Sequence, residues 1–375
     1  MNQTAPEGAS ASNGITGTRA VPAVFPPTSG FQTELRKQVD AYFEATGKPR
    51  RDLPMMYVKT AVLLAWWGAS YWLLMFHQHS ALEAVLLSIS LGLALAGIGF
   101  NVAHDACHGA YSRRGFVNQC MGHTLDLVGG SSYVWKQKHN HLHHTYTNVA
   151  GADDDIDFGY IGRLSPDQPL RGIHRYQHLY LWLLYGGLAV AWQYHDVTRL
   201  LRGRIGPHPL ERPRGWELAL VIIGKALFVT LMFVIPALFH PLGTVLLYFG
   251  IAYFTLGLTM AVVFQLAHCV EITAFPKLPE NDGRMEHEWA VHQIETTANF
   301  ARGNPLLTWY LGGLNYQVEH HLFPRISHLH YPALSAIVER SCARFGIRYL
   351  AHRTIWDAIG SHYRFLRRSH SHQPA

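Results

Sequence analysis

Long apolar segments alternate along the chain with polar segments that are rich in histidine. A helix crosses the roughly 30 Å hydrocarbon core of a bilayer with about 20 predominantly apolar residues. Four segments meet this requirement: residues 57–76, 81–103, 216–239 and 243–267. Because the links within each pair are only a few residues long, consecutive segments form hairpins. The pattern predicts an all-α integral membrane protein with four transmembrane helices in two hairpins.

Basic residues are unevenly distributed around these segments. The hairpin links 77–80 and 240–242 contain no lysine or arginine, whereas the residues before the first span, between the hairpins and after the fourth span contain several. Basic residues close to a span stay preferentially on the cytoplasmic side. We therefore expect both termini in the cytoplasm, where the polar segments form a helical cap.

Three further segments complete the predicted organisation. Residues 1–30 are rich in Ala, Ser, Thr, Gly and Pro and are expected to be a disordered tail. Residues 31–349 form the main domain, in which the apolar stretch 179–192 is too short to span a bilayer and is expected to be an interfacial helix. Residues 350–375 are expected to form a C-terminal helix and tail.

The composition fits a membrane protein that offers imidazole as its metal ligand. The 375 residues are 49% hydrophobic and only 15% charged, and the net charge of +6 fits basic cytoplasmic loops better than a nucleic-acid partner. The chain has 25 histidines but only 4 cysteines, none in a C-x-x-C pair. Nitrogen donors without thiolates suit iron, zinc, copper or nickel.

Histidine clusters follow the predicted spans. His104 and His108 lie four residues apart at the end of the second span, and the run 139–144 contains four more histidines. A third cluster, 317–321, reads QVEHH, and His268 ends the fourth span. Each cluster alone could be a set of ordinary polar side chains. All of them lie on the predicted cytoplasmic side, however, and eight converging imidazoles exceed the ligands of one four-coordinate zinc, which implies two metal ions.

The three clusters, written H-x-x-x-H, H-x-x-x-H-H and Q-x-x-H-H, resemble the histidine boxes of the membrane fatty acyl desaturases, and the resemblance covers about residues 31–349. Glutamine at the start of the third box is similar to the front-end subgroup, which places a double bond between an existing one and the carboxyl end. The resemblance implies two iron ions, O2 as co-substrate, and a fatty acyl substrate carried by coenzyme A, a carrier protein or a glycerolipid. The implied ligands are His104, His108, His139, His143, His144, His268, His320, His321 and Gln317.

The sequence departs from the family pattern at three places. Stearoyl-type relatives have an asparagine four residues before His268, where this chain has Phe264, and Asn299 is a candidate substitute. His141 lies within the second box but off its pattern, so we leave it out of the ligand set. The His-Pro-Gly-Gly haem motif of a fused cytochrome b5 is absent from the sequence. Electrons are therefore expected from a separate donor, such as a ferredoxin or a cytochrome b5 with its reductase, which favours a bacterial inner membrane over the endoplasmic reticulum.

Other residues near the boxes have two interpretations each. Side chains that accept hydrogen bonds from ligand histidines orient the imidazole rings; the candidates, which could equally be helix-surface groups, are Asp105, Asp153, Asp157, Asn299 and Glu319. Trp135 and Trp309 could line a substrate channel or anchor the protein at the membrane interface. Lys225, within the third span, is expected to extend its charge to the interface.

Other functions compete with desaturation at this stage. A hydroxylase on the same histidine scaffold would differ only in the second oxidation step. A non-catalytic metal or haem protein would place its ligands within the spans, whereas these histidines lie at or beyond the span ends. A zinc protease is excluded, because His287, Glu288 and His292 are spaced one residue more widely than H-E-x-x-H requires.

Overall fold

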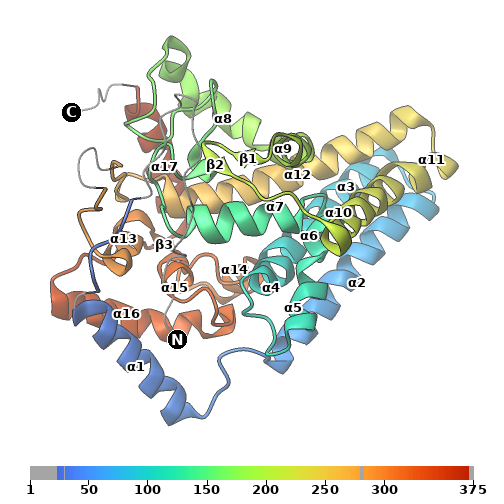
Figure 1. Cartoon of the computed structure of the whole chain (residues 1–375). Helices are drawn as coiled ribbons and strands as arrows, with labels where there is room; N and C mark the ends of the chain where they lie inside the picture. The colour runs from blue at the N-terminus through green and yellow to red at the C-terminus, as the bar shows by residue number, and fades with distance from the viewer. Residues whose placement is uncertain (1–22, 29, 279–282, 371–375) are drawn as a thin grey trace.

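A computed structural model of the protein describes residues 23–28, 30–278 and 283–370. The described chain is mainly helical, as predicted, with long helices extending from one end and shorter helices gathered at the other (Figure 1). Four strands of two residues each form two small ladders. β1 (Arg204–Ile205) pairs antiparallel with β2 (His208–Pro209), and β3 (Asn299–Phe300) pairs parallel with β4 (Ala351–His352).

Three helical segments of the described chain are long and apolar enough to cross a membrane. Ala81–Cys107 comprises α3 (Ala81–Ile98), the π-helical turn η1 (Gly99–Ala103) and α4 (His104–Cys107). Gly215–Phe239 comprises α10 (Gly215–Val229), the π-helical turn η5 (Thr230–Val234) and α11 (Ile235–Phe239). The third segment is α12 (Leu242–His268).

The first predicted span corresponds to α2 (Pro54–Phe76), which has 23 residues. Its buried Lys59 and its tryptophan and tyrosine residues make it less apolar than the other three segments. Three helices of the described chain, rather than four, therefore meet the length and composition requirement. A membrane-spanning position for α2 stays a prediction.

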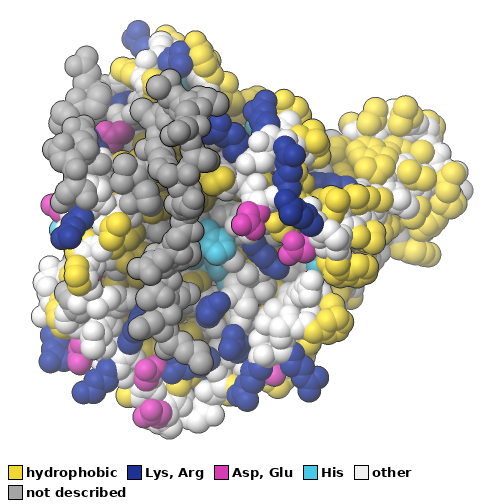
Figure 2. Space-filling view, viewed as in Figure 1, with side chains coloured by type: hydrophobic (Ala, Val, Ile, Leu, Met, Phe, Trp, Pro, Cys, Tyr) yellow, Lys and Arg dark blue, Asp and Glu magenta, His cyan; other side chains and the backbone are white. Residues whose placement is uncertain are grey.

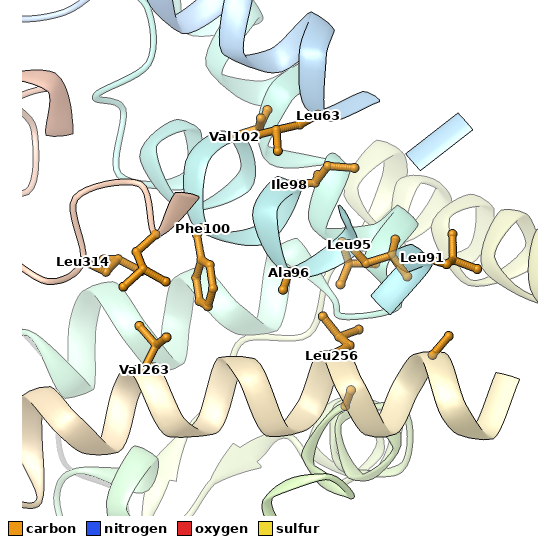
Figure 3. Packing of buried hydrophobic residues seen from close by; sticks show 14 of the residues in the cluster. Leu63, Leu91, Leu95, Ala96, Ile98, Phe100, Val102, Leu256, Val263 and Leu314 are labelled. Atoms are coloured by element: carbon orange, nitrogen blue, oxygen red, sulfur yellow. The ribbon is translucent and has the colours of Figure 1, made fainter. Parts of the chain in front are cut away.

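The core of the long helices centres on α3, which packs against both α2 and α12. In Figure 3, Leu91 and Leu95 of α3 lie close to Leu256 of α12. Gly92 permits the close approach, since a Cβ atom there would lie 2.3 Å from the Ala252 carbonyl oxygen. Small residues allow helix backbones in membrane bundles to approach in this way.

The predicted interfacial helix at 179–192 is divided into two helices, α8 (Gln177–Tyr185) and α9 (Leu188–Arg202). The division occurs at Gly186, where a Cβ atom would lie 2.2 Å from the Phe254 ring of α12. The bend therefore depends on glycine and on packing against α12. A position at the membrane interface stays a prediction for this segment.

Lys225 of α10 does not extend to the surface as expected. Its Nζ donates hydrogen bonds to the Gly129 carbonyl oxygen at 2.7 Å and to Gln193 Oε1 of α9 at 3.0 Å. The charge lies 3.6 Å from the buried carboxylate of Asp196. The half-buried Lys225 thus connects α10 to α9.

The terminal segments pack against the shorter helices. α1 (Gly30–Thr46) buries Phe31, Leu35 and Val39 in a core shared with α16 (Tyr331–Phe345). The predicted disordered tail is wrong for residues 23–28, because Val24 exchanges backbone hydrogen bonds with Gly283 and Met285. The rest of that tail, residues 1–22 and 29, lies outside the described residues, as do 371–375 of the predicted C-terminal tail.

The remaining elements are all shorter than the membrane-length segments. α17 (Ile355–Arg368), the predicted C-terminal helix, packs against α12 and α8. The others are α5 (Gly115–Gly122), α6 (Thr124–Val128), α7 (Ser132–Trp135), η2 (Lys136–His143), η3 (Asp154–Ile156), η4 (Gly172–Tyr176), α13 (Trp289–Thr296), α14 (Pro305–Tyr310), α15 (Gln317–Leu322) and η6 (His328–His330).

Candidate metal centre

Two π-helical turns position the first two histidine clusters. The amide of His104 donates to the Gly99 carbonyl, and the amide of His144 donates to the His139 carbonyl at 3.0 Å, so each hydrogen bond spans five residues. A π-helical turn is wider than an α-helical turn and is often found at functional sites. The wide turn η2 brings His139, His143 and the consecutive His144 to the same side of the chain.

The structure brings all eight predicted histidines together. Groups whose ring nitrogens lie within 4.8 Å of one another are His104, His108, His139 and His320; His143, His268 and His321; and His144, His320 and His321. The His104 and His320 ring centroids are 4.4 Å apart, and those of His144 and His321 are 4.2 Å apart. Residues from η2, α4, α12 and α15 therefore meet in one buried cluster.

The donor set fits metal ions. Buried ring nitrogens without a hydrogen-bond partner in the described chain are found on seven of the eight: His104, His108, His139, His143, His144, His268 and His321. A buried polar atom without a partner is costly, and a metal ion would satisfy these nitrogens. Nε2 of His320, the eighth histidine, lies 3.0 Å from Nε2 of His144. A neutral imidazole carries only one N–H group, so this many converging ring nitrogens cannot all satisfy one another by hydrogen bonds. A bound metal ion would satisfy them.

Burial keeps most of these rings neutral, which is the state that binds metals. Burial and neighbouring imidazoles hold the pKa values of His108, His144, His320 and His321 well below the usual range. Burial lowers the pKa of His139 to about 3. His143 is the exception, because the nearby Asp153 carboxylate outweighs burial and raises its pKa.

Two carboxylates of the loop after η2 contact the cluster. Asp153 Oδ2 accepts from His143 Nδ1 at 2.9 Å, as predicted for an orienting residue, and both side chains are fully buried. Asp155 lies 3.3 Å from His139 Nδ1 and also pairs with Lys138, a role that the sequence analysis did not assign to it. The prediction for Asp157 is wrong, since its exposed carboxylate accepts only from the Gly159 amide.

A third acid, Asp105, lies beside the cluster and belongs to a chain of buried groups. Asp105 Oδ1 lies 3.8 Å from His104 Nδ1, while its Oδ2 accepts from His328 Nδ1 at 2.9 Å. The other ring nitrogen of His328 lies 2.8 Å from Lys59 Nζ of α2. His328 and Lys59 were not predicted as site residues, because no spacing connects them to the boxes.

Gln293 of α13 is a further neighbour that the sequence did not indicate. Its Oε1 accepts from His321 Nδ1 at 2.7 Å and from the Thr147 hydroxyl at 2.9 Å. Gln317, a predicted ligand, lies with its Nε2 2.9 Å from His268 Nε2. Phe264 stacks on the His268 ring, with centroids 4.5 Å apart.

Asn299 and Glu319 form a separate buried network. Glu319 accepts from Asn299 Nδ2 and from the Tyr349 hydroxyl, each at 2.8 Å. Asn299 Oδ1 accepts from the Val318 amide, so neither Asn299 nor Glu319 hydrogen-bonds a histidine. Burial raises the pKa of Glu319 to about 7. These hydrogen bonds fix α15 against β3, and a role of either residue beside the metal ligands stays a prediction.

A cavity of about 800 Å³ begins at the cluster and continues between η1, α12 and α9. His104, His139 and Gln317 line it, together with apolar residues such as Phe100 and Val263. Trp135, a predicted channel residue, lines the cavity and stacks on His139 with ring centroids 4.3 Å apart. Trp309 does not line it and instead lies beneath the Lys59 ammonium group. The site combines a histidine cluster with space for a long apolar ligand.

A histidine-rich centre that could hold metal ions, beside a largely apolar cavity and at the ends of membrane-length helices, is typical of membrane enzymes with long apolar substrates. A family model described as fatty acid desaturase matches residues 80–353. The chain belongs to the fatty acid desaturase family, and its similarities support a front-end fatty acid desaturase.

Relatives with assigned names match most of the chain. A protein of Arthrospira platensis named sn-1 linoleoyl-lipid 6-desaturase is 40% identical over 92% of this chain and 94% of its own length. Proteins named acyl-lipid (8-3)-desaturase from Physcomitrium patens and Mortierella alpina are 36% and 34% identical over 90% and 92% of this chain, and over 71% and 78% of their own lengths. The chain is thus an enzyme of desaturase type, and the hydroxylase and carrier interpretations are set aside.

Proposed function

We propose that the chain is an iron-dependent acyl-lipid desaturase that introduces a cis double bond at position 6 of a linoleoyl chain esterified to a membrane lipid. The observation that carries the proposal is the convergence of eight histidines, seven of them with an unpartnered buried ring nitrogen in the described chain, next to a cavity that His104 and His139 line together with apolar residues. The names of the 40% identical relatives support the position and the lipid carrier.

The proposed iron ligands are the eight histidines and Gln317. Iron held there would supply the activation of O2 that removal of hydrogen from two adjacent methylene carbons requires, with two electrons from a donor protein. The chain itself positions the substrate, because His104, His139 and Trp135 form the part of the cavity wall where ligand and acyl chain would meet. Asp153 and Gln293 would hold the His143 and His321 rings in the tautomer that leaves Nε2 free for metal.

The proposed membrane arrangement has α2 as a fourth span, paired with α3, and places both termini and the histidine cluster on the cytoplasmic side. The basic residues of the polar segments support it. We place the protein in a bacterial inner membrane and propose a separate electron donor, a ferredoxin or a cytochrome b5 with its reductase.

The second box offers a matched test. His141 is exposed and lies in the same turn as His139 and His143, which are buried in the cluster. A host lacking polyunsaturated fatty acids would express the wild type, His143→Ala or His141→Ala and be fed linoleate. Mass spectrometry would locate the double bonds, and elemental analysis of the purified proteins would count iron.

We expect a new cis double bond at position 6 and two irons per chain from the wild type and from His141→Ala. His143→Ala should lose the product and part of the iron. A new bond at another position would overturn the proposed position but keep the desaturase. Full activity of His143→Ala would overturn the proposed ligand set.

A further inference from the structure

One face of α9 lines the cavity along nearly the whole helix. Residues three or four apart share a helical face, and the cavity-lining residues of α9 follow this spacing: Leu188, Ala191, Trp192, His195, Thr198, Arg199 and Arg202. The first three are apolar, whereas the last four are polar or cationic. The cavity wall therefore changes from apolar to cationic along a single helix.

The facing walls change in the same direction. Met260, Val263 and Phe100 line the apolar part, whereas Lys138 and Arg204 line the part near the C-terminal end of α9. Figure 2 shows Lys and Arg side chains gathered over the region where Figure 1 places α9, β1 and β2. We call Lys138, Arg199, Arg202 and Arg204 the cationic rim.

Asp154, Asp155 and Asp157 also line the cavity, and two of them, Asp154 and Asp155, pair with half of the cationic rim. Asp154 lies 2.5 Å from the Arg199 guanidinium and 4.0 Å from Lys138, which also pairs with Asp155. Arg202 and Arg204 are exposed and make no ion pair with the described part of the chain. Two guanidinium groups at the cavity mouth are thus available to a ligand.

We propose that the cationic rim binds the phosphate of a glycerophospholipid whose acyl chain occupies the apolar part of the cavity. This inference rests on the proposed function as an acyl-lipid desaturase. The planar guanidinium of arginine matches phosphate oxygens with paired hydrogen bonds. An apolar cavity with a cationic mouth fits a phospholipid better than it fits an uncharged glycolipid, which offers Arg202 and Arg204 no anionic group.

The cationic rim lies close to the histidine cluster. His139 contacts Asp155, Asp155 pairs with Lys138, and Asp154 connects Lys138 to Arg199. A head group bound at Arg202 and Arg204 would therefore lie on the side of the cavity that Lys138 and His139 also line. Only a short part of the acyl chain would lie between the head group and the histidines, which is the arrangement that a double bond near the carboxyl end requires.

The test compares the wild type, the double variant Arg202→Gln/Arg204→Gln and the control Arg214→Gln, which removes an exposed arginine outside the cavity lining. Purified holoenzyme would receive linoleoyl phosphatidylglycerol, linoleoyl monogalactosyl diacylglycerol or linoleoyl coenzyme A in the same mixed micelles. Binding of a fluorescent phosphatidylglycerol would be measured separately on the same proteins, as a readout independent of turnover.

We expect the double variant to bind phosphatidylglycerol roughly tenfold or more weakly, as the loss of two charge-assisted contacts predicts. Its kcat/KM should fall to a similar extent for phosphatidylglycerol but not for the galactolipid, and Arg214→Gln should match the wild type. Rising salt should weaken wild-type binding more than that of the double variant.

Equal losses on the phospholipid and the galactolipid, or no loss at all, would overturn the proposal. A loss confined to linoleoyl coenzyme A would reassign the cationic rim to a thioester carrier and overturn the phospholipid. If the wild type desaturates none of the substrates, the proposed function fails, whereas the binding measurement still decides whether the rim holds phosphate.

Discussion

Two groups of residues support the histidine cluster: Asp153 and its loop, which we call the loop side, and Asp105, His328 and Lys59, which we call the helix side. On the loop side, Asp153 hydrogen-bonds His143 directly and follows it by ten residues in the sequence. On the helix side, Asp105 stays 3.8 Å from His104 and instead bonds His328, which contacts Lys59, so the groups come from segments up to 269 residues apart. The loop side thus fixes the orientation of the His143 ring, a proposed metal ligand, whereas the helix side connects α2, α4 and η6 to one another.

Because of this difference, we expect the loop side to affect metal affinity and the helix side to affect the stability of the fold. A carboxylate that bonds a ligand ring directly should govern metal affinity. A buried pair of opposite charges bridged by a neutral histidine should govern stability, because removing one member leaves the other buried without compensation. The predictions below separate the two effects.

The largest effect is expected on the helix side. Asp105→Ala leaves the nearly fully buried Lys59 ammonium without its acid, and we expect a loss of about 3–5 kcal/mol in the free energy of unfolding. Reversible unfolding in detergent micelles would measure it. Adding Lys59→Met should restore part of the loss, since the double variant has no uncompensated charge. Additive losses from the two substitutions would contradict the bridged pair.

On the loop side, Asp153→Ala should lower iron affinity and kcat/KM by roughly 10–100-fold, the range typical when a partner of a ligand histidine is removed. Competition with an iron chelator would measure the affinity. Asp167→Asn, which removes a charge from the same loop where it pairs with Lys277, is the matched control and should bind iron normally. An Asp153→Ala protein with wild-type affinity would refute the direct role of the loop side.

Acidification should destabilise the iron-free protein. The pKa values of His108, His139, His144, His320 and His321 are lowered by burial, so the stability that their neutral state provides is complete above about pH 6.5 and is lost as the pH falls further. His143 acts in the opposite sense, because its raised pKa contributes stability that is lost as the pH rises. Because five of these histidine pKa values are lowered and one is raised, the net effect of acidification is to lower the free energy of unfolding.

Melting temperatures of chelator-treated protein between pH 8 and pH 5 would show the effect. Each pH unit over which one buried ring resists protonation costs about 1.4 kcal/mol, which corresponds to roughly 2 °C at an unfolding entropy of about 2.1 cal/mol/K per residue in a chain of 375 residues. Bound iron should suppress the fall. A melting temperature that rises on acidification would contradict the neutral state of the cluster.

The smallest effect is expected from Glu319→Gln, which changes an acid that contacts neither side. Burial raises its pKa to about 7, so its charged form disfavours folding increasingly as the pH rises from about 4.5 through 7. We expect an equal or higher melting temperature at pH 8 and unchanged iron content. Loss of iron would show that Glu319 acts on the adjacent His320 after all.

The sequence predicted much of this site because the relevant properties are local. The length of an apolar segment determines whether a helix can cross a membrane, and the eight histidines were found by their number, their spacing and their position at span ends. The length of an apolar segment and the spacing of histidines can both be read from the sequence without knowledge of the tertiary packing. The less apolar α2 shows the limit, since the role of Lys59 depends on His328, which is far away in the sequence.

Only the tertiary structure decided which groups support the histidines. The spacing could not distinguish Asp155 from Asp157, because the short helix η3, capped by Asp153, turns Asp155 toward His139 and leaves Asp157 exposed. Gln293 and His328 reach the cluster only because α13 and η6 pack against it. The same holds for the cavity, whose path depends on the glycine bend between α8 and α9. The sequence alone thus determined which histidines and carboxylates are available, whereas packing between distant segments decided how they are arranged. Hydrogen bonds act only over a few ångströms, and only the folded chain brings groups from distant segments that close together.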